Sequence, residues 1–473
     1  MKYKYQLLLT IALLWSCHLF AYDVEIDGIY YEKTSPITLV VTSGDNKYSG
    51  DIVIPDSVIC DGRKCSVTSI GKKAFYECTD LSSITFNKIL TYIGSYAFYG
   101  CTSLKRIALG KNITKIDDYA FAYCSSLTDY SFYVNDNTSF GYYIFAYCTS
   151  IKSFKSNAMK YIPKGMFKGC TSLSSISFPN ATSIGDEAFA ECTSLTGELV
   201  VKGNIGSAFQ NCTGLTSVVI TTSYRYGAVG GTSLHGQTFS GCSSITKVTL
   251  KRREEDFTNY QSGIIEGLEG SGLAACKNLK EIVVEDMEPN LKLIDGALYD
   301  GDNKLVLLPP RGKVVYVTPE NVKTIGTRSL ASGKDGDLKR VVLSAPIARI
   351  NQWAFYYCMY LEELYVYCKD PKEIYYEILA LEGDFRKVTL YVPIGCKEAY
   401  LAHDSWGRFW NRIEEFDPQN FDPYSYTSGI KSNVSNEEVV ADYSINGNKI
   451  KKTSKGINII KLKNGKTRKV IIK

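Results

Sequence analysis

The sequence predicts an α/β repeat solenoid, with a parallel β-sheet on one face of its coils and short helical turns on the other. One phrase of 20 to 24 residues recurs about ten times, and its cleanest copy is residues 93–109, IGSYAFYGCTSLKRIAL. Each copy ends in a segment of the form L-x-x-I-x-L, which favours a short strand. A period of this length with one strand per copy is typical of a solenoid.

A phenylalanine marks the same position in nearly every copy. This position holds Phe75, Phe98, Phe121, Phe145, Phe167, Phe189, Phe209, Phe239 and Phe355, and Leu330 takes it in one further copy. One copy has apolar side chains for only one layer, so the copies must stack to bury them. Stacking places each phenylalanine on the next and aligns the strands, which we expect at 81–86, 104–109, 127–132, 173–178, 215–220, 245–250, 279–284, 338–343 and 361–366.

A corner residue lies four positions before the phenylalanine, and it distinguishes two backbone conformations. The corner is Gly71, Gly94, Asp117, Gly141, Pro163, Gly185, His235, Gly326 or Asn351. Glycine, aspartate and asparagine would suit a left-handed backbone, but the φ of proline is fixed near −65°. All four residue types are tolerated at the start of a helix. We therefore expect a short helix of one or two turns, which carries the residues A-F-x-x-C of each copy.

Residues 1–21 have the pattern of a secretory signal peptide. Two lysines precede an apolar run, and a small residue, Ala21, stands before polar Tyr22, which predicts cleavage after Ala21. A membrane anchor is the first alternative, but the run is short for a span and lacks a stop-transfer flank. A lipoprotein signal ending at Cys17 is the second alternative, and the bulky Trp15 disfavours it.

The remaining chain divides by pattern into five regions. Residues 22–66 have short alternating strands and predict an N-terminal β cap, and 67–366 form the solenoid. Inserted loops are expected at 221–236 and 251–272, and an inserted hairpin at 300–319; the loops could bind a partner or be tolerated variation in length. Residues 367–416 predict a C-terminal cap, and 417–430 a linker. The tail, 431–473, has 11 basic and three acidic residues and the pattern of small β strands.

The cysteines need two different explanations. Eight of them, from Cys78 to Cys242, hold the position three residues after the phenylalanine, so stacking would place them side by side in the interior. Parallel side chains do not readily form disulfides, which favours a row of buried free thiols. Cys60 and Cys65 flank a predicted Asp61-Gly62 turn and could form a disulfide across it.

Composition and motifs argue against enzymatic and nucleic-acid-binding roles. The formal net charge is only +5 in 473 residues, which does not favour a nucleic-acid partner. Of the three histidines, His18 lies in the signal peptide, His235 at a corner and His403 near the C-terminal cap. Neither of the last two has a ligand or base partner at motif spacing, and no P-loop, G-x-S-x-G or H-E-x-x-H occurs. We therefore expect no enzyme activity, no cofactor, no metal site and, once the signal is removed, no membrane span.

The phrase I-G-x-x-A-F-x-x-C-x-x-L resembles the repeat of BspA-like leucine-rich repeat proteins, which are surface or secreted proteins of Gram-negative oral and gut bacteria. The resemblance covers about 27–415, including DGIYY at 27–31 and LYVPIGCKEAY at 390–400. It implies a leucine-rich repeat fold and adhesion to host extracellular-matrix or plasma proteins or to other cell-surface proteins. The tail resembles the terminal part of a type IX secretion sorting domain in the phrases SINGNKI, GINIIK and KVIIK, although it is shorter than a full domain.

Two surfaces could carry the binding. The turn side has tyrosines next to the phenylalanines, and the candidate binding residues there are Tyr76, Tyr99, Tyr123 and Tyr147; the sheet side adds Lys105 and Arg106. Tyrosine gives contact area at low entropic cost, yet these rings could equally complete the packing of each copy. The function predicted is an exported adhesin at the cell surface or in the medium, and the alternative is a carbohydrate-binding protein that captures glycans.

Overall fold

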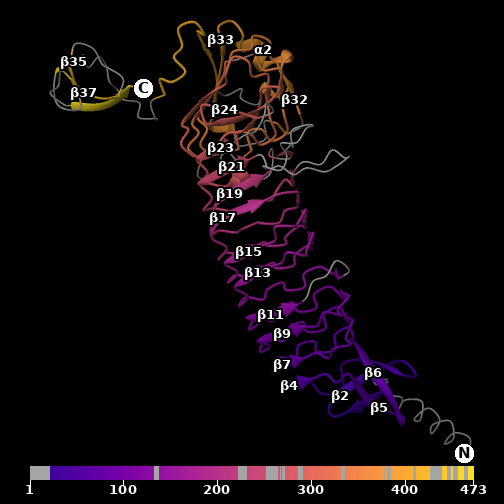
Figure 1. The fold of residues 1–473 in the computed structure, drawn as a ribbon. Helices are drawn as coiled ribbons and strands as arrows, with labels where there is room; N and C mark the ends of the chain where they lie inside the picture. Colours follow the sequence, from indigo (N-terminus) through magenta and orange to yellow (C-terminus); the bar gives the residue numbers. More distant parts are fainter. Residues whose placement is uncertain are drawn as a thin grey trace, which may run out of the picture. The chain divides into compact units, whose positions relative to one another are not determined.

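The computed structural model describes residues 22–132, 138–221, 232–251, 265–266, 268, 272–285, 291–309, 311–331, 336–344, 346–356, 358–377, 379–380, 385–407, 412–426, 439–444, 449–450, 456–462 and 467–472. The chain divides into two compact units, Met1–Phe421 and Asp422–Lys473. The first unit contains the repeats, whose coils are stacked one on another (Figure 1). The predicted signal peptide and most of the two predicted inserted loops lie outside the described residues.

One longer strand per coil forms the first row of strands. Its members are β4 (Gly50–Val53), β7 (Leu81–Thr85), β9 (Arg106–Leu109), β11 (Asp129–Phe132), β13 (Ser153–Lys155), β15 (Ser175–Ser177), β17 (Gly197–Val201), β19 (Leu215–Thr221), β21 (Lys247–Lys251) and β23 (Glu281–Glu285). Parallel pairing within the row is confirmed. The row is divided, however, into β4–β7, β9–β11, β13–β15 and a four-stranded sheet from β17 to β23.

A second row of short strands, which the sequence analysis did not predict, lies immediately before the corner residues. It consists of β6 (Arg63–Ile70), β8 (Tyr92–Ile93), β10 (Lys115–Ile116), β12 (Ser139–Phe140), β14 (Tyr161–Ile162), β16 (Ser183–Ile184), β18 (Asn204–Ile205), β20 (Thr232–Leu234) and β22 (Ile265–Glu266). Neighbours pair in parallel from β6 to β12 and again from β14 to β22. Its isoleucines, such as Ile93 and Ile116, are buried.

The segment after the corner is a series of turns and not the predicted short helix. The N–H groups of Tyr76 and Cys78 donate to carbonyl oxygens three residues earlier. The N–H groups of Phe75 and Glu77 donate instead to the next coil, to Ala97 and Tyr99. A helix would keep all these donors within one coil, whereas the stack uses every second donor to join coils. Positive φ values interrupt any helix here, as at Glu77, where φ is +54°.

Close contact between coils explains the corner glycines. None of the nine corner residues has a positive φ, so a left-handed backbone is not the reason for glycine there. A Cβ added to Gly94 would lie 2.7 Å from the backbone nitrogen of Lys72, and one on Gly185 would lie 2.7 Å from that of Lys164. Glycine at the corner therefore lets one coil approach the backbone of the coil before it.

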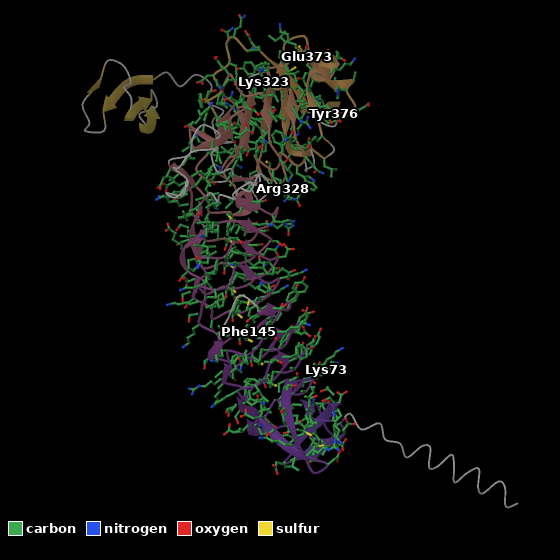
Figure 2. All side chains as sticks on the ribbon, turned by 45° about the vertical axis from the view of Figure 1, so that its right-hand side comes forward. Lys73, Phe145, Lys323, Arg328, Glu373 and Tyr376 are labelled. Carbon is green, nitrogen blue, oxygen red and sulfur yellow. The ribbon has the colours of Figure 1, made fainter. Side chains whose placement is uncertain are left out.

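The predicted stack of phenylalanines is confirmed from Phe75 to Phe239. Successive ring centroids in this stack are 4.7 to 5.9 Å apart and the rings are nearly parallel. Figure 2 shows Phe145 among the side chains of the coils, where it is fully buried. Leu273 takes the phenylalanine position in the copy whose strand was expected at 279–284, an assignment that the sequence analysis did not make. Cys276 follows Leu273 by three residues, and the Cys276 thiol donates to the carbonyl oxygen of Phe239 as in the other coils.

Antiparallel strands begin the solenoid and appear again later in the same unit, after β23. At the start, β1 (Val24–Ile26), β2 (Ile29–Ser35) and β3 (Thr38–Val41) are antiparallel, and β5 (Ser57–Cys60) pairs with β6. Later, β24 (Leu291–Ile294), β25 (Ala297–Asp300) and β26 (Lys304–Leu307) repeat this arrangement. Both β1–β2 and β24–β25 turn at an Asp-Gly pair with positive φ, Asp27-Gly28 and Asp295-Gly296.

The hairpin predicted at 300–319 is wrong. Its first half, β26, pairs with β25 and then in parallel with β28 (Thr324–Ile325), whereas its second half, β27 (Val315–Val317), pairs with β29 (Arg340–Leu343). The two halves therefore belong to different rows of strands, and the chain between them crosses from one row to the other. The row of β28 continues with β30 (Arg349–Ile350) and β32 (Tyr375–Tyr376). The row of β29 continues with β31 (Glu363–Val366), β33 (Thr389–Pro393) and β34 (Ile413–Phe416).

Helical structure in the described residues is short. It comprises the 3-10 helices η2 (Leu273–Ala275), η3 (Pro371–Glu373) and η4 (Phe385–Lys387) and one α-helix, α2 (Lys397–Leu401). Next to α2, Trp406 is fully buried and its ring packs against Tyr400 at 5.6 Å. The last described strand of this unit is β34, which pairs in parallel with β33.

The second unit contains the predicted β strands of the tail. They are β35 (Val439–Ser444), β36 (Lys449–Ile450), β37 (Gly456–Leu462) and β38 (Thr467–Ile472). All three pairings are antiparallel, in the order β36–β35–β37–β38. The expectation of a small β element in 431–473 is confirmed by these strands.

Candidate functional site

The four tyrosines predicted for binding form one row across four coils. The rings of Tyr76 and Tyr99 are stacked at 5.2 Å, and those of Tyr123 and Tyr147 at 4.7 Å. Tyr99 and Tyr123 join the two pairs at 5.1 Å, with their rings tilted by 52°. The tilt arises because Tyr99 stands one residue after its phenylalanine, whereas Tyr123 stands two residues after its own. These four residues therefore form a continuous line of rings.

A second row of tyrosines, which the sequence analysis missed, lies beside the first. The rings of Tyr96 and Tyr119 are stacked at 5.0 Å, and those of Tyr119 and Tyr143 at 4.9 Å. Tyr96 contacts Tyr99 of the first row at 5.5 Å. The signal was present in the sequence, since all three precede their phenylalanine by two residues. We call the two rows together the tyrosine stripe: Tyr76, Tyr96, Tyr99, Tyr119, Tyr123, Tyr143 and Tyr147.

Most of the stripe stands on left-handed backbone. The φ values of Tyr96, Tyr119, Tyr123, Tyr143 and Tyr147 lie between +56° and +62°. This conformation is uncommon for a residue with a Cβ and costs about 1–2 kcal/mol. The N–H groups of Tyr119 and Tyr123 each donate to a carbonyl oxygen of the next coil, at 2.9 and 2.8 Å, which holds the backbone in place. The chain therefore keeps aromatic residues where glycine would be less strained.

Two glycines make room for the last rings of the stripe. Gly165 and Gly169 occupy the same two positions in the coil that follows Tyr143 and Tyr147. A Cβ on Gly165 would lie 2.1 Å from the ring of Tyr143, and one on Gly169 would lie 2.3 Å from the ring of Tyr147. The rings thus lie over backbone that carries no side chain, and the stripe ends at this coil.

The rings are partly buried, and two lysines stand at one end of the stripe. The most exposed ring is that of Tyr123, at 41%. Burial raises the pKa of Tyr99 and Tyr119 above the ordinary value of 10, so these hydroxyls are neutral at pH 7. At one end the ammonium groups of Lys47 and Lys73 lie 5.6 and 5.0 Å from the centre of the Tyr76 ring. Figure 2 shows Lys73 at the surface.

Lys105 and Arg106 do not belong to the stripe. Arg106 begins β9 and Lys105 directly precedes it, so both lie on the strand segment of the coil rather than on its turns. The side chains of both residues are exposed. The structure therefore separates the six candidate residues into a group of four tyrosines and a basic pair in the row of longer strands.

Cys60 and Cys65 lie close together as free thiols. Both are buried, on the paired strands β5 and β6, and the Cys65 sulfur lies 4.0 Å from the carbonyl oxygen of Cys60. Asp61 and Gly62 between them have φ of +51° and +73°, as expected for the predicted turn.

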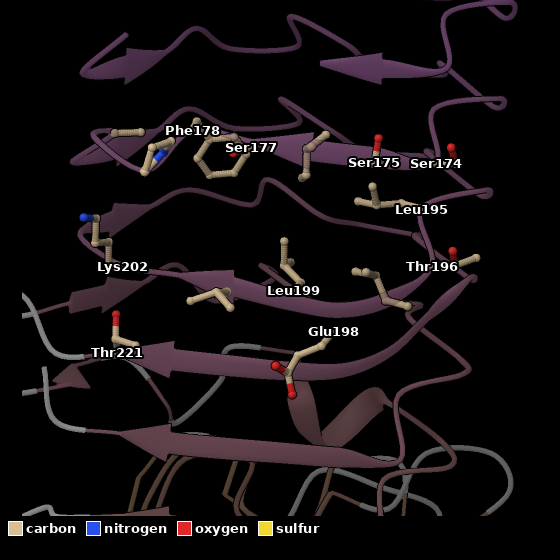
Figure 3. Close-up of a pocket in the computed structure, with 15 residues that line it drawn as sticks. Ser174, Ser175, Ser177, Phe178, Leu195, Thr196, Glu198, Leu199, Lys202 and Thr221 are labelled. Atoms are coloured by element: carbon tan, nitrogen blue, oxygen red, sulfur yellow. The ribbon is translucent and has the colours of Figure 1, made fainter. Parts of the chain in front are cut away.

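A cleft of about 540 Å³ opens in the row of longer strands between β15 and β17 (Figure 3). Ile176, Phe178 and Leu199 give it an apolar lining, and hydroxyl groups such as those of Ser175 and Thr196 line it as well. Figure 3 shows a wider separation between the strand of Ser175 and that of Leu199 than between the latter and the next strand. The sequence analysis did not predict this cleft.

An extra residue lies in the strand segment beside the cleft. In the neighbouring coils the first two inward residues of the strand segment are three apart, as in Leu173 and Ile176, but Leu195 and Leu199 are four apart. The pairing of β17 with β19 accordingly shifts register between Gly197 and Glu198, and Gly197 has φ of +80°. A bulge of this kind bends the strand.

The described residues contain neither a metal site nor a membrane-spanning helix. No group of three or more His, Cys, Asp or Glu side chains among them could hold a metal ion. Within the same residues, no helix is both long and apolar enough to cross a bilayer. His235 is exposed at its corner, and the ring of His403 packs edge-on against Tyr376 at 5.7 Å.

Solved structures of bacterial leucine-rich proteins are similar to this chain. Two similar solved structures are a leucine-rich cell surface protein from Faecalibacterium prausnitzii, 20% identical, and a leucine-rich repeat protein from Bacteroides ovatus, 18% identical. The matches cover 83% and 84% of this chain and 94% and 100% of theirs, with TM-scores of 0.42 and 0.45. No curated protein sequence matches.

The BspA type leucine rich repeat region matches in six copies, over residues 68–196, 200–299 and 314–380. These residues are the coils that carry the phenylalanine stack, the cysteine row and the tyrosine stripe. Because the match covers more than half of the chain, the protein belongs to the BspA type leucine rich repeat family.

Proposed function

We propose that this protein is an exported, non-enzymatic adhesin that binds host extracellular-matrix or plasma proteins, or other cell-surface proteins, through the tyrosine stripe. The family supports a surface protein with a binding role. The stripe is the observation that carries the proposal, because it joins seven tyrosines from consecutive coils into one partly exposed surface. Tyrosine is enriched in recognition surfaces because its rigid ring gives contact area at low entropic cost.

The geometry of the stripe favours a protein over a glycan. Within each row the ring faces are stacked on one another at about 5 Å, as for Tyr96 and Tyr119. Ring edges and hydroxyl groups therefore remain for a partner, and these suit the mixed apolar and hydrogen-bonding surface of a folded protein. A sugar ring that stacks on an aromatic side chain would instead need an open ring face.

The repetition of tyrosine in the stripe supports a role beyond packing. The left-handed backbone itself is common to other coils, where Glu77, Glu187 and Glu191 have positive φ at the same positions. What distinguishes the stripe is that tyrosine fills these positions in consecutive coils, whereas glycine fills them at Gly165 and Gly169.

Export by a signal peptide cleaved after Ala21 belongs to the same proposal, with the tail 431–473 as a sorting element. Mass spectrometry of the protein recovered from the surface and the medium of the cells that produce it tests the cleavage, and surface display of a deletion variant tests the sorting role. A mature N-terminus at Tyr22 is expected, and a chain that keeps residues 1–21 would contradict the cleavage. Loss of surface display on deletion of 431–473 would support the sorting role, and unchanged display would contradict it.

Binding of the purified protein to immobilised fibronectin, fibrinogen and laminin, at two salt concentrations, tests the adhesin function. We expect saturable binding to at least one of them. The variant Tyr123→Gly should weaken that binding at least about tenfold, since an aromatic residue at the centre of an interface contributes about 2 kcal/mol or more. Tyr161→Ala is the matched control, because Tyr161 is 46% exposed but lies in β14, outside the stripe.

Two results would change the proposal. Binding that Tyr123→Gly leaves unaltered would remove the stripe as the site. Saturable binding on a glycan array, with none to the three proteins, would favour the carbohydrate-binding alternative.

A further inference from the structure

We infer that Cys60 and Cys65 are a redox pair, and that a disulfide-class oxidant converts them to a disulfide that joins β5 to β6 beside their turn. The sequence alone places the two residues on either side of a turn, and the structure adds the face, the register and the surroundings of their thiols. The inference rests on the proposed function only in that export brings the protein into an oxidising environment.

Both thiols lie on the inner face of one hairpin. In the antiparallel pairing of β5 with β6, Cys60 is opposite Arg63 and Cys65 is opposite Val58. Cys65 therefore stands two residues beyond the partner of Cys60, and side chains two residues apart on a strand share a face. Cys60 and Cys65 are 4% and 2% exposed, whereas Ile59, on the other face, is 66% exposed. The two thiols are diagonal neighbours on the buried face.

The thiol of Cys65 interacts with Cys60 but has only distant backbone acceptors. Burial raises its pKa above the ordinary value of 9, and the neighbouring Cys60 thiol raises it further. The carbonyl oxygens of Pro36 and Arg63 lie 3.7 Å from the Cys65 sulfur. The carbonyl oxygen of Cys60 lies 4.0 Å from it. Formation of a disulfide therefore breaks no short hydrogen bond of this thiol.

The cysteines of the repeat row are in a different situation. The thiols of Cys101 and Cys124 donate to the backbone carbonyl oxygens of Phe75 and Phe98 at 3.0 and 3.1 Å. Both residues are fully buried between coils. Side chains that stack in parallel do not readily adopt the dihedral angle of a disulfide. We therefore expect oxidation to select Cys60 and Cys65 over the row.

The turn between the two cysteines is exposed and held only loosely by its ion pair. Asp61 and Gly62 form the turn, and both are exposed. An ion pair joins Asp61 to Lys33 of β2 at 2.6 Å, but these side chains are 76% and 36% exposed. An exposed ion pair stabilises little. Opening of the hairpin at this turn would admit an oxidant to the thiols, and a disulfide would limit that opening.

The reaction is a thiol–disulfide exchange in two steps. The thiolate of one cysteine attacks a sulfur of the oxidant, a low-molecular-weight disulfide or a protein disulfide, and releases the other sulfur of the oxidant as a thiolate. The thiolate of the second cysteine then attacks the mixed disulfide and releases the remaining oxidant sulfur. The pair loses two protons and two electrons, and the disulfide of the oxidant becomes two thiols.

Oxidised glutathione provides the probe. The purified full-length chain is first reduced and then incubated with oxidised and reduced glutathione at pH 8. Remaining thiols are blocked with N-ethylmaleimide in denaturant, and the chain is digested with trypsin without reduction. Trypsin cleaves after Arg63 and Lys64, so residues 48–63 and 65–72 form one species only when a disulfide joins them.

We expect that joined species, together with N-ethylmaleimide on Cys101 and Cys124. Recovery of 48–63 and 65–72 as separate peptides, whether blocked or carrying glutathione, would overturn the inference. Disulfides within the row under the same conditions would contradict the selectivity.

Limited proteolysis of the native protein tests what the disulfide does. Cleavage by trypsin after Arg63 or Lys64 requires the hairpin to open. A disulfide that closes a loop of six residues lowers the entropy of the opened state, so we expect cleavage at least about tenfold slower in the oxidised protein. Equal rates in the oxidised and reduced proteins would contradict this role.

Variants assign the effect to the pair. Cys60→Ala and Cys65→Ala should each remove the difference between oxidised and reduced samples. Cys396→Ala is the matched control, because it removes a partly buried cysteine outside the hairpin and should keep the difference. A difference that persists in both hairpin variants would overturn the assignment.

The same peptides separate this inference from the proposed export, because oxidation by glutathione in solution does not depend on export. If the joined species forms while the protein recovered from cells keeps residues 1–21, the export proposal fails and the redox pair remains. If the recovered protein begins at Tyr22 while the two peptides stay separate in solution, only the redox pair fails.

Discussion

The thiol of Cys124 donates a hydrogen bond to the backbone carbonyl oxygen of Phe98 in the preceding coil, at an Sγ–O distance of 3.1 Å. The same contact joins consecutive coils all along the cysteine row, as between Cys148 and Phe121 at 3.1 Å. Each thiol therefore fills the interior of its own coil and also binds the backbone of its neighbour. This explains why the position is cysteine rather than alanine or valine, which have no donor.

Replacing Cys124 tests how much this contact contributes. Cys124→Ala removes the donor and leaves a small cavity, but the carbonyl of Phe98 still accepts from the N–H of Cys101 at 3.2 Å. We therefore expect a loss of about 1–2 kcal/mol in the free energy of unfolding, measured by urea denaturation. Cys124→Ser keeps a hydrogen-bond donor in the same place, so its loss in the free energy of unfolding should differ from that of Cys124→Ala. Equal losses would show that volume alone matters.

The cysteine row should resist alkylation in the folded protein. Burial raises the pKa of Cys78 from 9 to about 11 and that of Cys242 to about 12, so almost no reactive thiolate is present at pH 8. Cys368 and Cys396 are only partly buried and should react first. Mass spectrometry after a short treatment with iodoacetamide checks the order. Modification of Cys124 before Cys396 in the native state would contradict the burial of the row.

The glycines beneath the last tyrosines should be sensitive to a single methyl group. Gly165→Ala places a Cβ on the ring of Tyr143 and also requires a φ of +62°, so we expect a loss of about 1–3 kcal/mol in unfolding free energy. Gly110→Ala is the control, since nothing lies within 4 Å of its added Cβ. Thermal unfolding followed by circular dichroism compares the two, and equal melting temperatures would exclude the close contact.

At Tyr119, glycine should be more stable than alanine. Both variants lose the stacking on Tyr96 and Tyr143, but alanine keeps the strain of a φ of +57° and glycine removes it. The difference in unfolding free energy should be about 1 kcal/mol in favour of glycine. Urea denaturation of the two variants measures it. An alanine variant at least as stable as the glycine variant would mean that the backbone at Tyr119 is not held in the left-handed region.

Residue periodicity was enough to predict that the coils stack, but not the whole course of each coil. The fixed places of phenylalanine and cysteine predicted the ring stack and the buried thiols, because both follow from stacking alone. The short helix after the corner was a wrong prediction for a physical reason. Capping and φ preferences describe one coil by itself, whereas the N–H groups of Phe75 and Glu77 bind the next coil.

The candidate site was predicted only in part. The search for tyrosines just after the phenylalanine found Tyr76 and Tyr99. It missed Tyr96 and Tyr119, which stand two residues before their phenylalanines. The constant spacing of two residues was visible in the sequence, but only the backbone shows that these tyrosines lie beside the first row. The cleft lies beside one extra residue in the strand segment of residues 195–201, and a one-residue change in spacing is hard to distinguish from ordinary variation in a repeat.

Alkaline pH should destabilise this protein through its buried thiols. The buried thiols have raised pKa values in the folded state, so above pH 9 the unfolded chain has lost protons that the folded chain still holds. Their stabilising contribution is therefore complete below pH 9 and decreases as the pH rises toward 12. A thiol with the shift of Cys242 lowers the unfolding free energy by up to about 1.4 kcal/mol per pH unit in that range. Urea midpoints measured from pH 8 to 11 should fall, and the fall should be smaller in Cys242→Ala than in the unmodified protein. An equal fall in the two would mean that this thiol does not contribute to the alkaline transition.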